Sequence, residues 1–417
     1  MNFYHVKILI ILYLSFQNME NIDKIKNNIE TFISSSNKYN IKKEDITIEL
    51  KRIGGYSNFN YYGIIKNKST NEIIENIFYR EYGSKFEAIS NSINHEDEIK
   101  ITKLLAEKEY GPKVLFELKD NFCIIEFLTN TKNLPIEKYY DKNIIEQLCT
   151  ILNYFTTFSY VYKYEININN NDIKLIPIKN INNNDNNKKI NLTKNQYQKS
   201  MGELYDTAEK CFKNFYDKFK LKYSKEKNIN EFNDIELVKY NLENFKKIYN
   251  ENSYLKGFFV INHNDVLSVN ILYREKDKKI FLIDHEYFIL NLPGHDIAYY
   301  LAESFIKLEP IYSCDLEKVN FDNLFVIYEV FINKFIDSHH FIENEEYGKE
   351  FMEIIKTKKY FIKLMNAVNL YMFIWSIGNI NFDNWEKDAK KEFFLVHGID
   401  RIKFYLQGMK MLKKKDN

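Results

Sequence analysis

Two polar clusters stand at the ends of apolar, strand-like runs in residues 262–287, NHNDVLSVNILYREKDKKIFLIDHEY. The first cluster holds His263 and Asp265, Asn270 follows five residues after the aspartate, and the second cluster holds Asp284. The runs NILYR and KIFLIDHEY, joined by the charged turn EKDKK, predict a β-hairpin. We expect that hairpin to bring Asp265, Asn270 and Asp284 together. Two carboxylates and an amide at one point suit a hard divalent cation.

The spacing H-x-D-x-x-x-x-N is typical of the catalytic loop of phosphotransferases. In that template Asp265 accepts the proton of the attacking hydroxyl, while Asn270 and Asp284 hold Mg²⁺ against the nucleotide phosphates. Fixed cations neutralise the charge of the transferring phosphoryl group. The acceptor hydroxyl must lie in line with the phosphorus–oxygen bond that breaks. The competing interpretation makes Asp265 a loop-capping acid and Asp284 a strand-end acid. His263 is either a scaffold for the loop or a proton shuttle.

Composition places the chain among soluble globular enzymes. It has 417 residues, 45% hydrophobic and 28% charged, with a net charge of +1. That length suits one large domain or two lobes. The charge balance gives no electrostatic footprint for nucleic acid, so we predict no nucleic-acid partner. The four cysteines are far apart and form no CxxC pair, which favours a reducing, cytoplasmic location.

The N-terminus carries an apolar run at about residues 8–16, which is too short to span a bilayer. We interpret residues 1–19 as an extension that is not part of the fold. The alternative is a weak signal peptide, although the run is followed by no clear small-residue cleavage site. No later segment is interpreted as transmembrane, so no stable membrane insertion is expected. The tail MKMLKKKDN is interpreted as a solvated basic end.

A small β-rich region is predicted up to about residue 130. Residues 20–45 begin as an amphipathic helix, with Ile22, Ile25, Ile29 and Phe32 at helical spacing. Strands follow in ITIELKRIGGYSNFNYYGIIKN and NEIIENIFYREYG, then a helix that stops at Gly111-Pro112. FELKDNFCIIEFL predicts a hairpin with its turn at 119–121. Beyond residue 135 the helical period dominates, interrupted by an Asn-rich tract at about 166–192 that we interpret as a solvated, unfolded insertion.

Several motifs, in order, resemble the choline and ethanolamine kinases. They are RIGGYSNFNYYGI, YREYGSK, LLAEKEYGPKVLFELKDNFCIIEFL, HNDVLSVNIL and IDHEYFILNLPGHDIAYYLAE. The similarity covers most of residues 40–130 and 255–410. It implies an α+β, two-lobed, protein-kinase-like fold. Residues 20–130 form the nucleotide-binding N-lobe, and 131–417 form a larger, mainly helical C-lobe with the catalytic loop.

The resemblance also implies nucleotide-binding roles, with ATP and Mg²⁺ as cofactors. Arg80 contacts the phosphates in place of the kinase strand lysine, Glu98 pairs with it, and Glu126 and Phe127 lie at the hinge beside the adenine. Gly54, Gly55, Ser57 and Asn58 cover the nucleotide. Asp296 braces the catalytic loop as a buried acid. From the residues alone, the glycine pair is equally well a plain turn, the charges are surface charges, and Asp296 is a helix N-cap.

The acceptor implied by the resemblance is a small cationic amino alcohol. Aromatic rings and carboxylates bind such an ammonium group, and the candidates are Glu286, Tyr287, Glu303, Tyr371 and Trp375. Core packing is the alternative for the rings, and a solvated charge is the alternative for each carboxylate. Glu286 is also a candidate second metal ligand.

This chain departs from the family pattern at three places. His285 replaces the phenylalanine of IDFEY, and Glu81 replaces an aliphatic residue before Tyr-Gly. The family's W-x-x-W pair aligns with Met372 and Trp375, so one ring is lost. The loss weakens the case for trimethylated choline and leaves ethanolamine open.

The first hypothesis is therefore an ATP-dependent choline kinase that makes phosphocholine, the first step of phosphatidylcholine synthesis by the CDP-choline route. An ethanolamine kinase, feeding phosphatidylethanolamine synthesis, is the close alternative. An aminoglycoside phosphotransferase shares HxDxxxxN, but the IDHEY and GHDI segments argue against it. A pseudokinase scaffold is disfavoured by the intact Asp265, Asn270 and Asp284. A homodimer is left open.

Overall fold

The structure is a computed structural model. It describes residues 22–36, 38–39, 41–53, 59–82, 95–119, 121–158, 160–167, 172–180, 256–307, 313–380 and 391–413, with scattered helical positions between 209 and 243. Several predictions fall outside the described residues: the N-terminal extension, the loop with Gly54, Gly55, Ser57 and Asn58, much of the Asn-rich tract, most of the helices expected at 194–250, and the basic end beyond residue 413.

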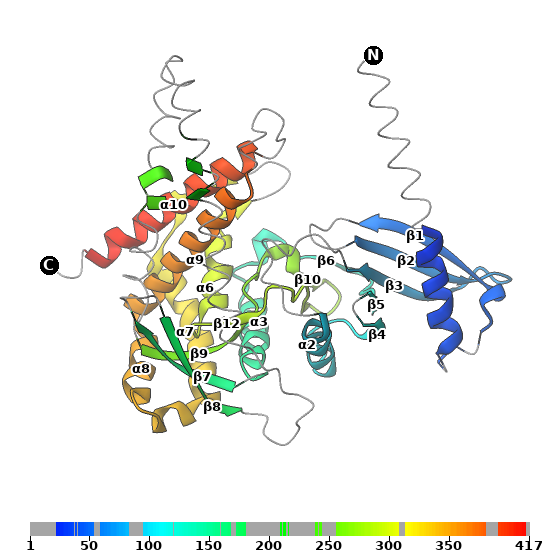
Figure 1. Ribbon diagram of the computed structural model, residues 1–417, viewed down its shortest axis with the longest axis horizontal. Helices are drawn as coiled ribbons and strands as arrows, with labels where there is room; N and C mark the ends of the chain where they lie inside the picture. The colour runs from blue at the N-terminus through cyan, green and yellow to red at the C-terminus, as the bar shows by residue number, and fades with distance from the viewer. Residues whose placement is uncertain are drawn as a thin grey trace, which may run out of the picture. The chain divides into compact units, whose positions relative to one another are not determined.

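The chain divides into two compact units. The first comprises residues 1–86 and 102–130, and the second comprises 87–101 and 131–417. Among the described residues the first unit is built around a β-sheet, and the second is mainly helical with smaller sheets (Figure 1). This mixture confirms the α+β class predicted from the sequence.

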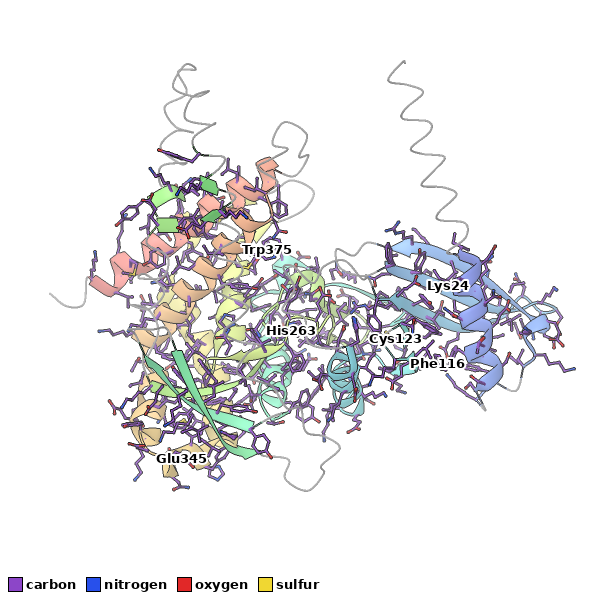
Figure 2. The ribbon with its side chains drawn as sticks, viewed as in Figure 1. Lys24, Phe116, Cys123, His263, Glu345 and Trp375 are labelled. Atoms are coloured by element: carbon purple, nitrogen blue, oxygen red, sulfur yellow. The ribbon has the colours of Figure 1, made fainter. Side chains whose placement is uncertain are left out.

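The first unit is an antiparallel sheet covered by one helix. Its strands, in the order β1-β2-β3-β5-β4, are β1 (Ile46–Ile53), β2 (Phe59–Asn67), β3 (Ile73–Glu81), β5 (Phe122–Glu126) and β4 (Val114–Leu118), with the short 3₁₀ turn η1 (Lys43–Asp45) before β1. The helix over residues 22–35 buries Ile25, Ile29 and Phe32 in one core with Ile77 and Tyr79 of β3. Lys24 also pairs with Glu81 at 2.6 Å (Figure 2). The predicted amphipathic helix and the β4–β5 hairpin are thus confirmed.

Helix α2 (His95–Glu107) ends earlier than the sequence predicted. The expected stop was Gly111-Pro112, but the chain leaves the helix through Glu109, whose φ of 57° is left-handed. The amide of Tyr110 donates to the carbonyl of Leu105 at 2.9 Å, and that of Glu109 donates to Ala106 at 2.9 Å. This pair of bonds is a Schellman motif, which satisfies the last helical carbonyls without a glycine.

The second unit combines antiparallel sheets with helices. Its strands are β6 (Thr131–Asn133), β7 (Tyr160–Asn167), β8 (Asp172–Asn180), β9 (Lys256–Asn262), β10 (Ile271–Arg274), β11 (Lys279–Leu282), β12 (Ile289–Asn291), β13 (Ile306–Lys307) and β14 (Ser313–Cys314). Its helices are α3 (Lys142–Phe155), α6 (His295–Glu303), α7 (Phe321–Ser338), α8 (Gly348–Ile355), α9 (Lys358–Gly378) and α10 (Lys391–Lys413), with 3₁₀ turns η2 (Ile136–Lys138), η4 (Ser268–Asn270), η5 (Leu316–Lys318) and η6 (His340–Asn344). The sheet orders are β11-β10-β6, β12-β9-β7-β8 and β13-β14.

Part of the Asn-rich tract is folded, which corrects the prediction of an unfolded insertion. Residues 172–180 form β8, which pairs with β7 along its whole length. Only one side of β8 is paired in the sheet order, and Ile176 remains 40% exposed. Pro177 is tolerated because such an edge strand need not donate on its outer side, and the pairing is irregular opposite Val161 and Tyr162. The polar composition therefore marks an edge rather than a loop.

The helical core of the second unit is centred on α9 and α10, which lie side by side (Figure 1). Leu370, Phe373 and Ile374 of α9 pack with Phe394 and Ile402 of α10. Among the described helices, α9 is the one long and apolar enough to cross a membrane by length and composition, but 72% of its most apolar stretch is buried inside the protein. Its apolarity is accounted for by its place in the core.

Candidate active site

A buried strand and a hairpin deliver the polar residues of the opening motif. Strand β9 is buried from Gly257 to its end, and its last residue, Asn262, leads directly into the His263–Asp265 loop. The hairpin β10–β11 has the predicted form, with Ile271 opposite Leu282. The amide of Ile283 donates to the carbonyl of Asn270 at 3.0 Å, which extends the pairing by one residue. Asn270 precedes the first strand of the hairpin, and Asp284 follows Ile283 after the second strand. Both residues therefore lie at the same end of the hairpin.

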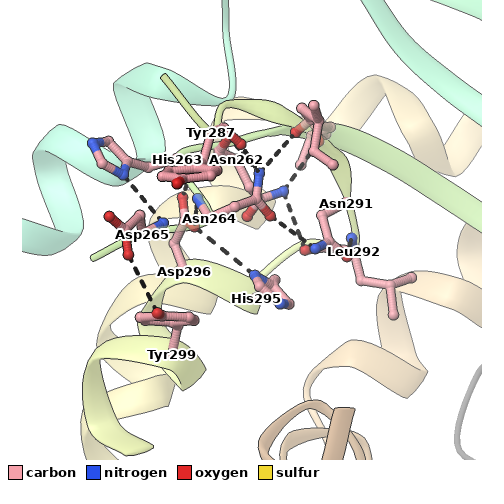
Figure 3. Close-up of polar contacts among 12 residues, drawn as sticks. Asn262, His263, Asn264, Asp265, Tyr287, Asn291, Leu292, His295, Asp296 and Tyr299 are labelled. Atoms are coloured by element: carbon pink, nitrogen blue, oxygen red, sulfur yellow. Dashed lines mark hydrogen bonds and ion pairs between the residues drawn. The ribbon is translucent and has the colours of Figure 1, made fainter. Parts of the chain in front are cut away.

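The carboxylate of Asp265 is held by donors from two elements. Its Oδ2 accepts a hydrogen bond from Nδ2 of Asn270 at 2.7 Å, and its Oδ1 accepts one from the hydroxyl of Tyr299 at 3.3 Å (Figure 3). Asn270 Nδ2 also donates to the backbone carbonyl of Asp265 at 3.0 Å. The sequence predicted that Asp265 and Asn270 meet, whereas Tyr299 was not singled out.

Acidic residues surround Asp265. Burial raises the pKa of Asp265 to about 8, and the negative charge of Asp284 is the next largest cause. Glu303 and Glu286 raise this pKa further, while the hydrogen bond from Asn270 lowers it. Four acidic side chains thus act on one another in a partly buried site. Such a site attracts cations, whether metal ions or the ammonium group of a ligand.

Asp296 clamps the backbone of the loop. Its Oδ2 accepts the amide of His263 at 2.7 Å and its Oδ1 accepts the amide of Asn264 at 2.8 Å (Figure 3). The side chain is 1% exposed and lies in the first turn of α6, where the helix dipole favours a negative charge. The predicted brace is confirmed.

Glycine is required where α6 begins. Gly294 precedes the helix with a φ of 84°, and a Cβ there would come within 2.7 Å of the Tyr328 ring. Both the backbone conformation and the close ring exclude a side chain. This turn sets the position of Asp296, and therefore of the clamped loop.

His263 has the contacts of a scaffold residue. Its ring is fully buried, and Nδ1 accepts the backbone amide of Asp265 at 3.3 Å. The proton therefore resides on Nε2, which donates to the carbonyl of Ile283 at 3.1 Å. Burial lowers the pKa of His263, so the ring is neutral near pH 7. Nδ1 thus braces the loop from within, and Nε2 connects the loop to the hairpin.

Asn264, between the two residues that the motif highlights, was missed. Its backbone is left-handed, with φ 62°, and its Nδ2 donates to the carbonyls of Asn262, Tyr287 and Ile289. Its Oδ1 accepts from Asn291 at 2.9 Å. The residue type could have indicated this role, because asparagine tolerates a left-handed backbone and its side chain forms hydrogen bonds with nearby backbone groups.

The donor set fits a magnesium ion. The amide nitrogen of Asn270 is committed to Asp265, so its amide oxygen is the atom left to serve as a ligand. Asp284 adds a partly exposed carboxylate on a left-handed backbone, with φ 64°. Within the described residues, no group of three or more His, Cys, Asp or Glu is arranged to hold a metal ion. Mg²⁺ sites commonly use one or two carboxylates together with substrate phosphates, so Asn270 and Asp284 stay candidate ligands.

Three of the candidate acceptor residues lie close to Asp265. Burial raises the pKa of Tyr371, and the charge of Asp265 raises it further. The pKa of Tyr287 is raised by burial, then by Glu286 and Asp265. Glu286 is 7% exposed. Charged and aromatic groups are thus gathered in one place.

The other two candidates belong to a buried network that reaches α10. Glu303 forms an ion pair with Arg401, and both side chains are buried. Arg401 also donates to Nε2 of His397 at 3.2 Å. Trp375 contacts the rings of His397, at 6.3 Å, and Phe394, at 5.5 Å between centroids. The charge of Glu303 is therefore balanced within the protein.

The candidate nucleotide residues are divided between the units. Arg80 lies on β3 opposite Asn60 and Cys123, and is 7% exposed. The ring of Phe127 packs on Tyr62 with centroids 4.3 Å apart. Glu126 accepts the amide of Lys113 at 3.3 Å. These residues belong to the first unit, whereas Glu98, on α2, belongs to the second, and its pairing with Arg80 stays a prediction.

Comparison with known structures identifies the fold as that of the choline kinases. The structure is similar to a choline kinase from Cryptosporidium parvum, with a TM-score of 0.56 and 16% identity over 95% of this chain and 97% of that chain. An ethanolamine kinase from Plasmodium vivax gives a TM-score of 0.48 and 17% identity over 85% of this chain and 81% of that chain. None of the curated proteins matches the sequence.

The family is shown by the sequence as a whole. The model of the choline/ethanolamine kinase family matches residues 50–406, which is most of the chain. The chain belongs to this family, and the protein is an ATP-binding kinase that acts on an amino alcohol. The resemblance found in separate motifs is thereby confirmed.

Proposed function

We propose that the protein is a choline kinase, which transfers the γ-phosphoryl group of ATP to the hydroxyl of choline and releases phosphocholine and ADP. The observation that carries the proposal is the Asp265 carboxylate, held by Asn270 and surrounded by acidic and aromatic side chains. Phosphocholine production places the enzyme at the first step of phosphatidylcholine synthesis by the CDP-choline route, in the cytoplasm.

Asp265 is the proposed general base. Its oxygens are oriented by hydrogen bonds, and its loop is clamped by Asp296, so the carboxylate is aimed before substrate arrives. The choline hydroxyl gives its proton to Asp265 as its oxygen attacks the γ-phosphorus, and the bond to the β-phosphate oxygen breaks. His263 supports this loop through both ring nitrogens. Positioning supplies much of the acceleration in such reactions.

Asn270 and Asp284 are the proposed Mg²⁺ ligands. When bound, the ion neutralises negative charge on the nucleotide phosphates. Arg80 is proposed to contact the phosphates and Glu98 to pair with it, while Glu126 and Phe127 border the adenine. Gly54, Gly55, Ser57 and Asn58 are proposed to cover the nucleotide.

The ammonium group of the acceptor is proposed to bind among Glu286, Tyr287, Tyr371 and Trp375. The quaternary ammonium of choline has no N–H donor, so it binds through charge and aromatic faces. Because Arg401 balances the charge of Glu303, we assign the direct electrostatic contact to Glu286. Glu303 then shapes the pocket from behind. A homodimer is also compatible with this proposal.

Ethanolamine is the second candidate acceptor. Met372, at the position of the family's first tryptophan, is buried, and its sulfur lies 3.1 Å from the hydroxyl oxygen of Tyr299. A ring that would cover a methyl group of choline is therefore replaced by a flexible thioether. A primary ammonium depends less on rings, because its N–H groups can donate to carboxylates.

A substrate panel tests the proposed function. ADP release is coupled to a spectroscopic readout with purified protein, ATP and Mg²⁺, and with choline, ethanolamine, an aminoglycoside or no acceptor. We expect the highest kcat/KM with choline. A higher value with ethanolamine would replace choline in the proposal. Bound ATP without turnover of either amino alcohol would favour a non-catalytic scaffold.

A further inference from the structure

Helix α6 reaches the Asp265 loop at two points that lie one turn apart. Asp296 binds the loop backbone, and Tyr299, three residues later on the same helical face, donates its hydroxyl to Oδ1 of Asp265 (Figure 3). Asn270 donates to the other carboxylate oxygen, Oδ2. Each oxygen of Asp265 therefore has a donor from a different element.

We propose that Tyr299 is a positioning residue for phosphoryl transfer, which fixes the rotation of the Asp265 carboxylate toward the acceptor hydroxyl. The inference rests on the proposed function, in which Asp265 is the base. The terminal torsion of an aspartate is broad, so one donor alone leaves the carboxylate free to turn about it. A second donor on the opposite oxygen removes that freedom. Misplacement of a reacting group by even one ångström is costly to the rate.

The Tyr299 hydroxyl has two acceptors within reach but only one proton. Oδ1 of Asp265 lies at 3.3 Å and Sδ of Met372 at 3.1 Å. A carboxylate is a much stronger acceptor than a thioether sulfur, so the proton goes to Asp265. The distance of 3.3 Å is long for this bond, and hydrogen bonds of this kind tighten when substrate binds.

The tyrosine ring is held rigidly enough to direct its hydroxyl. Tyr299 is 1% exposed and follows the rotation of α6, whose first turn is anchored at Gly294 and Asp296. The ring of His295, one turn earlier, lies 6.3 Å away between centroids. Because the ring is buried and its helix is anchored, the Tyr299 hydroxyl has little freedom to move away from Asp265.

The test is Tyr299→Phe, which removes the hydroxyl and keeps the ring. We expect kcat to fall about five- to tenfold, as for loss of one hydrogen bond of ordinary strength, with the KM values for ATP and acceptor unchanged. Tyr300→Phe is the matched control. Its buried hydroxyl, on the same helix, donates to the carbonyl of Tyr139 at 2.8 Å, and its loss should leave kcat per folded enzyme unchanged.

A double-mutant cycle that combines Tyr299→Phe with Asp265→Asn separates a positioning role of Tyr299 from a general effect on packing. In that background the base is absent, so Tyr299→Phe should cost nothing further in kcat. An equal loss in both backgrounds, a wild-type kcat for Tyr299→Phe, or a rise in acceptor KM alone would each overturn the inference. The assay uses whichever acceptor the wild-type enzyme phosphorylates fastest. Failure with choline alone therefore counts against the proposed substrate and not against Tyr299.

Discussion

Asp265 depends on its neighbours for any chemistry it performs. An aspartate in water is a weak base, and burial among Asp284, Glu286 and Glu303 raises the pKa of Asp265 to about 8. A higher pKa makes the carboxylate a stronger proton acceptor, while the hydrogen bond from Asn270 opposes the rise by favouring the charged form. The acids around it also attract the cations that a phosphotransferase needs.

Replacing Asp265 by alanine tests the role of the base. We expect kcat to fall by roughly 100-fold or more, because general base catalysis contributes that much, while the Kd for ATP stays nearly constant. Asp277→Ala is a suitable control. Asp277 is exposed in the turn of the same hairpin and pairs with half-buried Arg274, so its loss should leave kcat intact. Normal turnover by Asp265→Ala would remove it as the base.

Asp284→Ala tests the metal site at the same scale. Without this carboxylate, we expect turnover to be lost or the Mg²⁺ concentration for half-maximal rate to rise roughly tenfold or more. The measurement is a Mg²⁺ titration at saturating ATP. An unaltered metal dependence would exclude Asp284 as a ligand.

At the scale of elements, helix α6 organises the site. Its first turn clamps the loop through Asp296, and its last residue, Glu303, connects it to α10 through Arg401. Arg401 is fully buried and also donates to Oδ1 of Asn369 on α9 at 3.3 Å. Three helices are thus joined by one guanidinium group.

Arg401→Met should strongly destabilise the protein, because it leaves the Glu303 charge buried and unbalanced. We expect a loss of roughly 3–5 kcal/mol in the free energy of unfolding, measured by urea denaturation. The double variant Glu303→Leu with Arg401→Met should recover much of that loss.

The exposed ion pair between Lys334 and Glu146, which also joins two helices, provides the matched comparison. Lys334→Met should cost less than about 1 kcal/mol. An Arg401→Met variant as stable as the wild type would show that the buried pair does not hold these helices together.

At the scale of the whole molecule, acid sensitivity follows from buried histidines. Burial lowers the pKa values of His263, His339 and His397, and that of His339 falls to about 4. His339 is fully buried, with Nδ1 close to the carbonyl of Phe335 at 3.0 Å. These histidines therefore bind protons more readily in the unfolded chain than in the folded protein.

Stability should decrease as pH falls from about 6.5 to about 4. In this window His339 binds a proton in the unfolded chain but not in the folded protein. This difference alone lowers the free energy of unfolding by roughly 3 kcal/mol. His339→Gln should melt at a lower temperature at pH 7.5, but with a shallower decline toward pH 4.5. Exposed His340→Gln is the control and should keep the wild-type slope. An unchanged slope in His339→Gln would contradict this account.

Local patterns predicted most of what lies close together in the sequence. The helix of residues 22–35, the β4–β5 hairpin and the β10–β11 hairpin each follow from a periodic apolar pattern bounded by turn residues. The prediction failed where an element depends on its partner. Strand β8, DIKLIPIKN, lies within an Asn-rich tract and contains a proline, and it is a strand because β7 offers a long edge to pair with.

The sequence alone determined the chemistry available: the identity and order of Asp265, Asn270 and Asp284, and the family to which the motifs belong. Only the tertiary structure decided which distant groups complete the site. Tyr299 reaches Asp265 across 34 residues, and Arg401 neutralises Glu303 across 98. A periodic pattern reports which face of an element is buried. It carries no information on which other element that face meets, because packing between helices depends on shape and not on spacing along the chain.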